Sequence, residues 1–429
     1  MLRERLQALV SAPVALIVAA LAAGSAKAES ASQSGDTAAE PPVARPKHKP
    51  INLEIEAPSL DFMHDVTKFL NEFHDEYRGF KKELRRDYDL HYSMTASIIP
   101  QWGVPDGGPG VLQMVYTPYV TWSPFTDTAV GSGSFSFTMQ QTQFWTKTVT
   151  RSQQARLGLI TPPNDQTVNV RQYNQLLYTH TFPDAWSWLS LAVGQYTFAA
   201  YDSNEYAGNV QTNFLSYPLA QNATQTYPYG ALGAYAQAAT PDQQFTFAGG
   251  FQGATNVAGN ALSTRGFATG KYAYFMAGEW APNFLGGGAY SLLGYYQPSV
   301  PQQPTNSPGV SFSAVQNIDP KWGLFLRANG AGGTAIPIET SVAWGGIYNN
   351  PLGRNKLDQA GLGIFCDKTN LKAVGQPARN AEWGVEIYYN YALFKALWLT
   401  PDIQLYFNPA LKPGAGPAAV FTIRTTAFF

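Results

Sequence analysis

The sequence predicts an all-β protein whose strands close into a transmembrane antiparallel β-barrel, preceded by an amphipathic helix. Only 13% of the 429 residues are charged, against roughly 25% in average soluble domains, whereas 14% are aromatic. Apolar and polar residues alternate singly from about residue 90 to the end, which is the period of a strand with two unlike faces. All ten tryptophans lie between Trp102 and Trp398, many of them beside turns, as in the aromatic girdles of a membrane barrel.

The composition also excludes several classes of protein. The abundance of aromatic residues excludes disorder over most of the chain. There are 28 basic and 29 acidic residues, so no basic surface for nucleic acid is expected. The one long apolar run lies at the extreme N-terminus, which argues against a helical membrane protein.

The N-terminal residues predict export. Arg3 and Arg5 precede an apolar run, and Ala26-Lys27-Ala28 follows it, which is the pattern of a secretory signal peptide over residues 1–28. The small residues and the cleavage site disfavour the alternative of a membrane anchor. The single cysteine, Cys366, is interpreted as a small strand residue without a redox or metal role.

Residues 29–59 are small, polar and proline-rich and predict a disordered linker, whereas residues 60–88 predict an amphipathic helix in the periplasm. Fourteen charged residues fall between positions 61 and 90. Apolar residues recur there at steps of three and four: Phe62, Val66, Phe69, Leu70, Phe73, Tyr77, Phe80 and Leu84. Two interpretations stay open: a plug or oligomerisation helix, or a helix that merely packs under the next domain.

Residues 89–429 predict the barrel. Apolar and polar residues alternate singly within segments 90–102 and 112–122. The turn cluster 104–110 separates the two segments, which together predict a hairpin. About 340 residues at roughly 20–22 per strand and loop give about 16 strands, an even number in the porin range. The last segment, 421–429, alternates and ends on Phe429, like the assembly signal of bacterial outer-membrane barrels. A sandwich of this length would need several domains with linkers, and no linker is evident here.

Several segments resemble the OprB family of carbohydrate-selective porins. They are WGLFLRANG (322–330), NNPLGRNKLDQAGLGIFCD (349–367) and EIYYNYALFKALWLTPDIQLYFNPA (386–410), with weaker matches at 189–208 and 227–237. The resemblance covers roughly residues 76–429 and is most specific near the C-terminus. It implies a 16-stranded barrel in the bacterial outer membrane and passive uptake of sugars. The helix at 60–88 is longer and more charged than the family pattern.

A porin lowers the barrier for a hydrated solute through a lining of polar and aromatic groups. The alternation directs the following residues into the lumen: Glu279, Arg327, Asn329, Glu339, Glu386, Tyr388, Asn390, Asp402, Gln404, Tyr406 and Arg424. Arg327 and Glu386 are the strongest candidates for sugar binding. Arg171 and Asp202 lie near segments that could fold inward as loops. The plainer alternative is that each residue only solvates a water-filled wall.

Arg354 and Asp358 are interpreted as a structural turn pair rather than as part of the lining. Catalysis is not expected, because neither His91 nor His180 lies beside a recognisable nucleophile motif. No Cys/His cluster suggests a metal site, and no cofactor is expected.

The sequence therefore predicts an outer-membrane porin for small neutral sugars, embedded in lipid. A general or small-solute diffusion porin is the first alternative, favoured by a lumen with charge of one sign. The second is a barrel for polysaccharide export that binds a periplasmic partner through the helix at 60–88. Association into a homo-oligomer is also left open.

Overall fold

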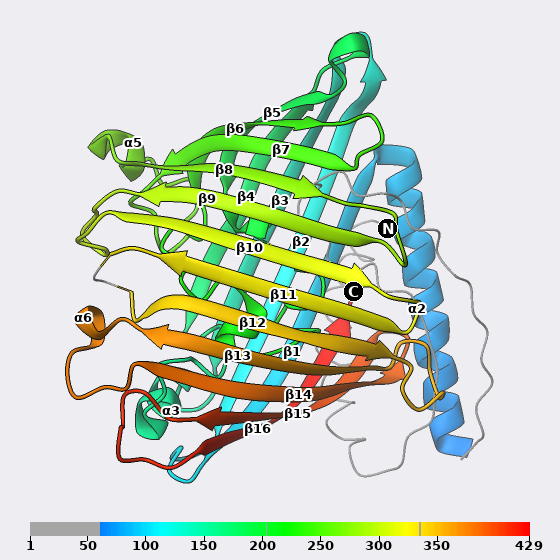
Figure 1. Ribbon diagram of the computed structural model, residues 1–429. Helices are drawn as coiled ribbons and strands as arrows, with labels where there is room; N and C mark the ends of the chain where they lie inside the picture. Colours follow the sequence, from blue (N-terminus) through cyan, green and yellow to red (C-terminus); the bar gives the residue numbers. More distant parts are fainter. Residues whose placement is uncertain (1–60, 203, 334–335) are drawn as a thin grey trace.

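The computed structural model describes residues 61–429 except 203 and 334–335, and within this range the chain forms a closed barrel of 16 antiparallel strands (Figure 1). In chain order the strands are β1 (Leu90–Val104), β2 (Val111–Thr128), β3 (Gly131–Phe144), β4 (Val170–Thr181), β5 (Leu189–Tyr196), β6 (Ala231–Ala239), β7 (Phe245–Gly253), β8 (Tyr272–Trp280), β9 (Gly288–Gln297), β10 (Ser307–Asn317), β11 (Trp322–Ala331), β12 (Ile338–Asn349), β13 (Gln359–Thr369), β14 (Ala381–Phe394), β15 (Leu397–Phe407) and β16 (Ala418–Phe428). This confirms the predicted class and strand number. The predicted signal peptide (1–28) and linker (29–59) lie outside the described residues.

Closure is made by the first and last strands. In β1 and β16, Thr95 pairs with Phe428 and Val104 with Ala419, while β1 also pairs with β2 along its other edge. Each strand therefore has a partner on both sides, and its backbone hydrogen-bonding groups are met within the sheet.

The two faces of the wall separate apolar from polar side chains, as the alternation predicted. In β14, Glu386 and Asn390 are buried on the lumen side, whereas Ile387 is 54% exposed on the outside. In β11, Arg327 is buried and Leu324 is exposed. The outward residues are mostly aliphatic and aromatic, which suits contact with lipid tails.

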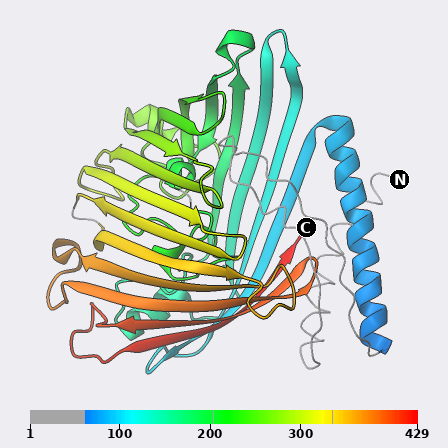
Figure 2. The ribbon, with the colours of Figure 1, turned by 45° about the vertical axis from the view of Figure 1, so that its right-hand side comes forward.

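The two ends of the barrel differ (Figure 2). One end, the turn end, carries the short connections, the start of β1 and the C-terminus. The other end, the loop end, carries longer connections, four of which contain the short helices α3 (Thr150–Leu157), α4 (Tyr217–Ala220), α5 (Arg265–Thr269) and α6 (Leu371–Val374). Two 3-10 turns, η1 (Asp184–Trp186) and η2 (Phe198–Asp202), complete the elements.

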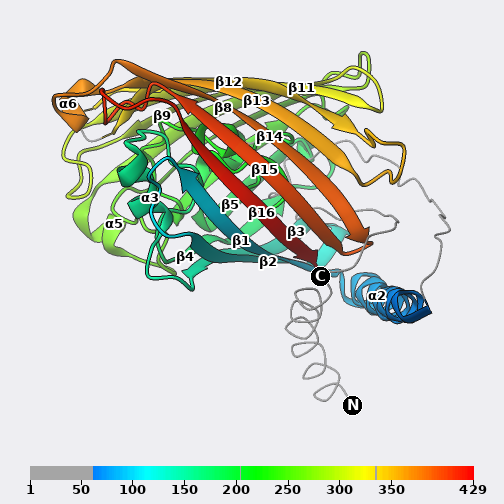
Figure 3. The ribbon, with the colours of Figure 1, turned by 90° about the horizontal axis from the view of Figure 1, so that it is seen from below.

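The predicted N-terminal helix is α2 (Asp61–Tyr88), and it lies beside the turn end rather than inside the barrel (Figure 3). The Tyr77 ring meets the Tyr92 ring of β1 edge-on at 6.0 Å, and the Lys395 ammonium lies 3.4 Å from the Asp75 carboxylate. Among the described residues no helix combines the length and apolar character needed to span a bilayer.

The segment 197–230 between β5 and β6, called the inward loop below, folds into the lumen. Its Phe214 ring lies 5.3 Å from Phe325 and 4.9 Å from Tyr388, both of which project from the wall. Leu219 packs beside them against Gly363 of β13, where a Cβ atom would come within 2.7 Å of the leucine side chain. Glycine at this position therefore allows the loop to approach the wall closely.

Candidate functional site

The inward loop is tied to the wall on the side of β14 and β16. The Glu386 carboxylate accepts hydrogen bonds from the backbone N–H groups of Leu215 (2.5 Å) and Ser216 (2.8 Å). The Arg424 guanidinium donates to the carbonyls of Val210 (2.6 Å) and Asn213 (2.8 Å). A carboxylate that caps N–H groups and a guanidinium that caps carbonyls together satisfy loop backbone that is buried in the lumen.

A second set of bonds ties the loop to β1, β2 and β10. The Gln211 amide donates to the carbonyls of Thr95 (3.2 Å) and Val115 (3.1 Å). The Asn204 amide donates to Ser313 Oγ at 2.9 Å, and the Ser311 hydroxyl donates a hydrogen bond to the Asp202 carboxylate. The loop is thus fastened across the barrel and narrows it from within.

The segment 145–169, which connects β3 and β4, also enters the barrel and lies against the inward loop. The Glu382 carboxylate of β14 accepts from the N–H groups of Ile160 (3.1 Å) and Thr161 (3.0 Å). The Tyr217 N–H donates to the Pro162 carbonyl at 3.1 Å, and the Gln221 amide donates to Asp165. The two loops therefore brace one another as well as the wall.

Between the loops and the wall lies a chamber of about 750 Å³. Among the described residues, four charged ones line it: Asp165, Asp202, Glu205 and Arg327. Its uncharged lining includes Tyr119, Thr138, Gln140, Gln172, Asn174, Gln175, Tyr196, Tyr201, Asn209, Gln221, Gln225, Tyr227, Tyr229, Tyr235, Gln237, Gln359 and Trp398. The chamber surface is thus dominated by amide, hydroxyl and tyrosine groups.

The chamber charge depends on pH. Burial raises the pKa of the Asp165 carboxyl to about 6, and hydrogen bonds from Gln166 and Gln221 offset part of this rise. Burial also raises the pKa of Asp202, while the Arg327 guanidinium opposes the rise. Asp165 therefore passes from neutral to charged as the pH rises through about 6.

Most of the predicted lining residues lie on the lumen side, but the inward loop covers them. Arg327, Glu386, Tyr388 and Asn390 are each at most 2% exposed. Glu386 and Asn390 bind loop backbone, the latter through the Thr212 carbonyl at 2.7 Å. These residues therefore position the loop, so a direct role in sugar binding stays a prediction.

The following residues that were predicted to face the lumen also lie on the lumen side. Asp202 belongs to a segment that does fold inward, as its position suggested. Glu279 is half-buried on the lumen side of β8, in step with buried Phe275 and opposite exposed Trp280. Further members of the predicted set are buried on the lumen face: Asn329, Asp402, Gln404, Tyr406 and Arg424.

Two predicted lining residues face the wrong way. Glu339 lies outside, where its carboxylate pairs with the exposed Lys368 ammonium at 3.2 Å. A bulge between Ile338 and Thr340 shifts the register and reverses the side on which Glu339 falls. Arg171 is an exposed residue near the start of β4, bonded to Gln141 at 2.9 Å, and no loop carries it inward.

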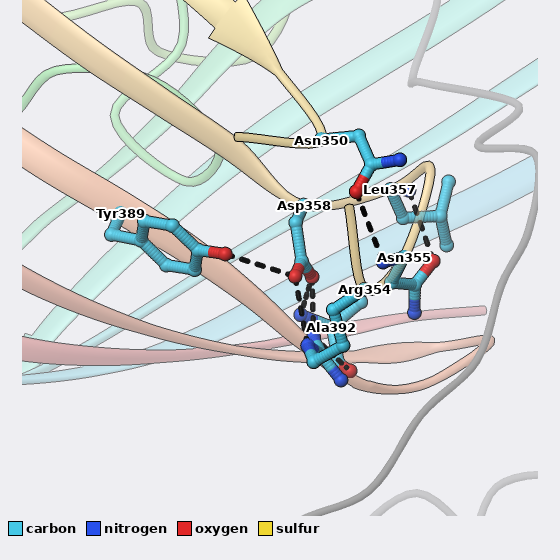
Figure 4. Close-up of polar contacts among 7 residues, drawn as sticks. All are labelled: Asn350, Arg354, Asn355, Leu357, Asp358, Tyr389 and Ala392. Carbon is cyan, nitrogen blue, oxygen red and sulfur yellow. Dashed lines mark hydrogen bonds and ion pairs between the residues drawn. The ribbon is translucent and has the colours of Figure 1, made fainter. Parts of the chain in front are cut away.

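The predicted turn pair forms between β12 and β13 (Figure 4). Asp358 is fully buried and accepts from both Arg354 nitrogens Nε and Nη2, from the Tyr389 hydroxyl (3.0 Å) and from the Ala392 N–H (3.0 Å). The Arg354 guanidinium also lies 3.5 Å from the centre of the Tyr391 ring. The pair locks this turn onto β14 at the turn end.

The chamber residues Asp165, Glu205, Tyr229 and Tyr235 were not predicted. Glu205 and Tyr229 belong to the inward loop, whose length far exceeds the roughly 15 residues at which loops without regular structure become uncommon. That excess length was the available signal. Asp165 lies in the connection 145–169, which is also longer than this limit, whereas Tyr235 lies on strand β6 and carries no comparable signal.

Comparisons with known proteins agree with this architecture. Porin AaxA of Chlamydia pneumoniae is 34% identical over 77% of this chain and 77% of its own, and porin AaxA of Chlamydia felis is 32% identical over 80% and 78%. The high-pH structure of OprB from Pseudomonas putida superimposes with a TM-score of 0.64 at 13% identity, covering 82% of this chain and 97% of that one, which shows the shared fold. The family model "Carbohydrate-selective porin, OprB family" matches residues 141–429. The chain therefore belongs to the OprB family of porins, which are outer-membrane channel proteins.

Proposed function

We propose that this porin carries small neutral carbohydrates across the bacterial outer membrane by passive diffusion, with the turn end toward the periplasm. The chamber lining carries the proposal. Four charged side chains line the chamber, and one of them, Arg327, is 2% exposed. The remaining surface offers amides and hydroxyls for sugar hydroxyls and tyrosine faces for sugar C–H groups.

The chamber also has a suitable size. Its volume of about 750 Å³ lies within the roughly 300–1,000 Å³ of small-molecule sites. A solute crossing it exchanges water contacts for many weak contacts of similar strength, so it can bind and still leave. The family model, which is described as carbohydrate-selective, supports the same solute class.

Single-channel recording in a planar bilayer tests the proposal. Neutral mono- and disaccharides are expected to reduce the ion current in a saturable manner. An open channel whose current no sugar alters would contradict carbohydrate selectivity and leave a general diffusion porin. A channel that is closed under all conditions would favour the export alternative.

Tyr235→Ala is expected to weaken sugar binding about fivefold, because the half-buried Tyr235 ring lines the chamber and a sugar–aromatic contact of about 1 kcal/mol is lost. The measurement is the sugar concentration at half-maximal block. Tyr274→Ala is the matched control, since Tyr274 lies on the outside of the wall and is 52% exposed. Equal effects of the two substitutions would show that Tyr235 makes no specific contribution to sugar binding.

A second candidate is a porin for small cationic solutes, and a specific observation favours it. In the described part of the chain three acids, Asp165, Asp202 and Glu205, line the chamber. The one basic residue there, Arg327, is covered by the inward loop and donates to the Asp202 carbonyl at 3.4 Å. Glu205 is exposed to the chamber. An acidic surface in a narrow water-filled space attracts cations and repels anions.

The acidic lining predicts cation-selective current that weakens below a pH of about 6, where Asp165 becomes neutral. The reversal potential in a potassium chloride gradient measures this selectivity. Asp165→Asn is expected to remove most of the pH dependence near 6, and Glu205→Gln to lower selectivity at neutral pH. Stronger block by glucosamine than by glucose would favour the cationic solute, and equal block the neutral one.

A further inference from the structure

Helix α2 has an apolar side whose role the channel does not explain. At about 100° per residue, its large apolar residues fall within an arc of about 120°. They are Phe62, Met63, Val66, Phe69, Leu70, Phe73, Tyr77, Phe80 and Leu84. Such an arc on a strongly charged helix is stabilised by an apolar environment.

The contact with β1 shows which way this side turns. Tyr77 packs on Tyr92, and Tyr92 projects from the outer face of β1. Ser97 marks the opposite, lumen face, since it binds Gln211 of the inward loop, and Trp102 marks the outer face with 46% exposure. At Tyr77 the apolar arc of α2 is therefore directed toward the lipid-facing side of the barrel.

The depth of the helix matches the edge of a bilayer. Tyr92 pairs with Val120, two residues from Trp122, which is 45% exposed on the outer face and stacks on Phe135. Outward aromatic residues near strand ends mark the membrane–water interface. Figure 1 shows α2 running across the turn end, transverse to strands β8 to β14, as expected of a helix parallel to the membrane plane.

The charged residues that flank the arc are separated by sign. Arg78 and Arg85 border one edge, and Glu76 and Glu83 border the other. Lys81 lies over the Tyr77 and Tyr92 rings, with its ammonium 5.6 Å and 5.4 Å from their centres. An apolar arc with charged borders is the pattern of a helix that rests between lipid headgroups and acyl chains.

We propose that α2 is an interfacial helix that lies on the phospholipid leaflet at the turn end, with its apolar arc in the bilayer. The lipid surface continues the lipid-facing wall of β1 and β2, beside which α2 stands (Figure 3). The Asp75–Lys395 ion pair and the Tyr77–Tyr92 contact hold the helix against the turn end of the barrel. This role is independent of which solute the chamber accepts.

The test uses the full-length mature barrel in vesicles of phosphatidylethanolamine and phosphatidylglycerol. In a Cys366→Ser background, single cysteines carry an environment-sensitive fluorophore at Leu70 or Phe80 on the arc, or at Lys68 or Lys82 on the opposite side. Lipids carrying a nitroxide near the headgroup are expected to quench the arc labels several-fold more than the matched controls. A nitroxide at the acyl-chain end is expected to quench all four weakly.

Equal, weak quenching at all four positions by the headgroup nitroxide would overturn the proposal. So would disulfide crosslinking of Leu70→Cys between copies, because the arc would then be a helix–helix seam. Protection of the arc labels without lipid quenching would place the arc against protein instead. Retained open-channel current in each labelled variant shows that the barrel has folded.

Discussion

Glu386→Ala is expected to give a channel with larger and noisier open current than the wild type. The carboxylate holds two backbone N–H groups of the inward loop, at Leu215 and Ser216, in a fully buried position. Each hydrogen bond to a charged group contributes about 1.5–3 kcal/mol, so the loop loses on the order of 3 kcal/mol of its attachment. The measurement is single-channel conductance together with the variance of the open state.

The loop itself gives a second readout for the same substitution. It holds Tyr206 and Phe214, which are buried in the wild type, so chymotrypsin is expected to cleave it in Glu386→Ala and not in the wild type. Glu339→Ala is the matched control, because that carboxylate forms an exposed ion pair outside the barrel and such pairs contribute about 0–1 kcal/mol. Unchanged current and protease resistance in Glu386→Ala would show that other anchors suffice.

Asp358→Ala is expected to lower the free energy of unfolding of the barrel by about 3–5 kcal/mol. The substitution removes the acceptor for Arg354, Tyr389 and Ala392 and leaves a largely buried guanidinium without its carboxylate. Unfolding by urea in lipid vesicles, followed by tryptophan fluorescence, measures the change. Tyr389→Phe, which removes one hydrogen bond, is expected to cost about 1 kcal/mol.

The Asp358→Ala substitution also tests whether the turn affects the pore. Asp358 itself does not line the chamber, and its neighbour Gln359, which does, is held separately by the Tyr388 hydroxyl and by pairing with Asn390, so the folded fraction of Asp358→Ala is expected to conduct and bind sugar as the wild type does. A change in sugar block in that folded fraction would mean that the turn also shapes the channel. The stability effect and the transport effect are thereby separated.

The barrel could be predicted because its strands repeat one simple physical requirement. Val385 and Ile387 alternate with Glu386 and Tyr388 because one face meets lipid and the other the lumen, and the structure confirms that alternation. The rule fails where the backbone breaks period two. At Glu339 an extra residue in the bulge reverses the side chain, and nothing in the local sequence marks the bulge.

The candidate site could be predicted only in part. Arg327, Glu386 and Asn390 were correctly directed inward, but alternation does not say what lies against them. The inward loop covers all three, and its path depends on bonds between residues that are far apart in sequence, such as Gln211 with Thr95. Such contacts follow from the closed barrel and leave no periodic signal in the chain.

The amino-acid sequence by itself determined the barrel, its approximate strand number, the direction of most wall residues and the helix before β1, because each rests on a local period and on burial in lipid or water. The tertiary structure alone decided that two loops enter the lumen, that Glu386 and Arg424 hold one of them, and that Asp165, Glu205 and Tyr235 line the chamber. The physical reason is that buried loop backbone must find hydrogen-bond partners wherever the closed wall offers them, and those partners are set by proximity in space.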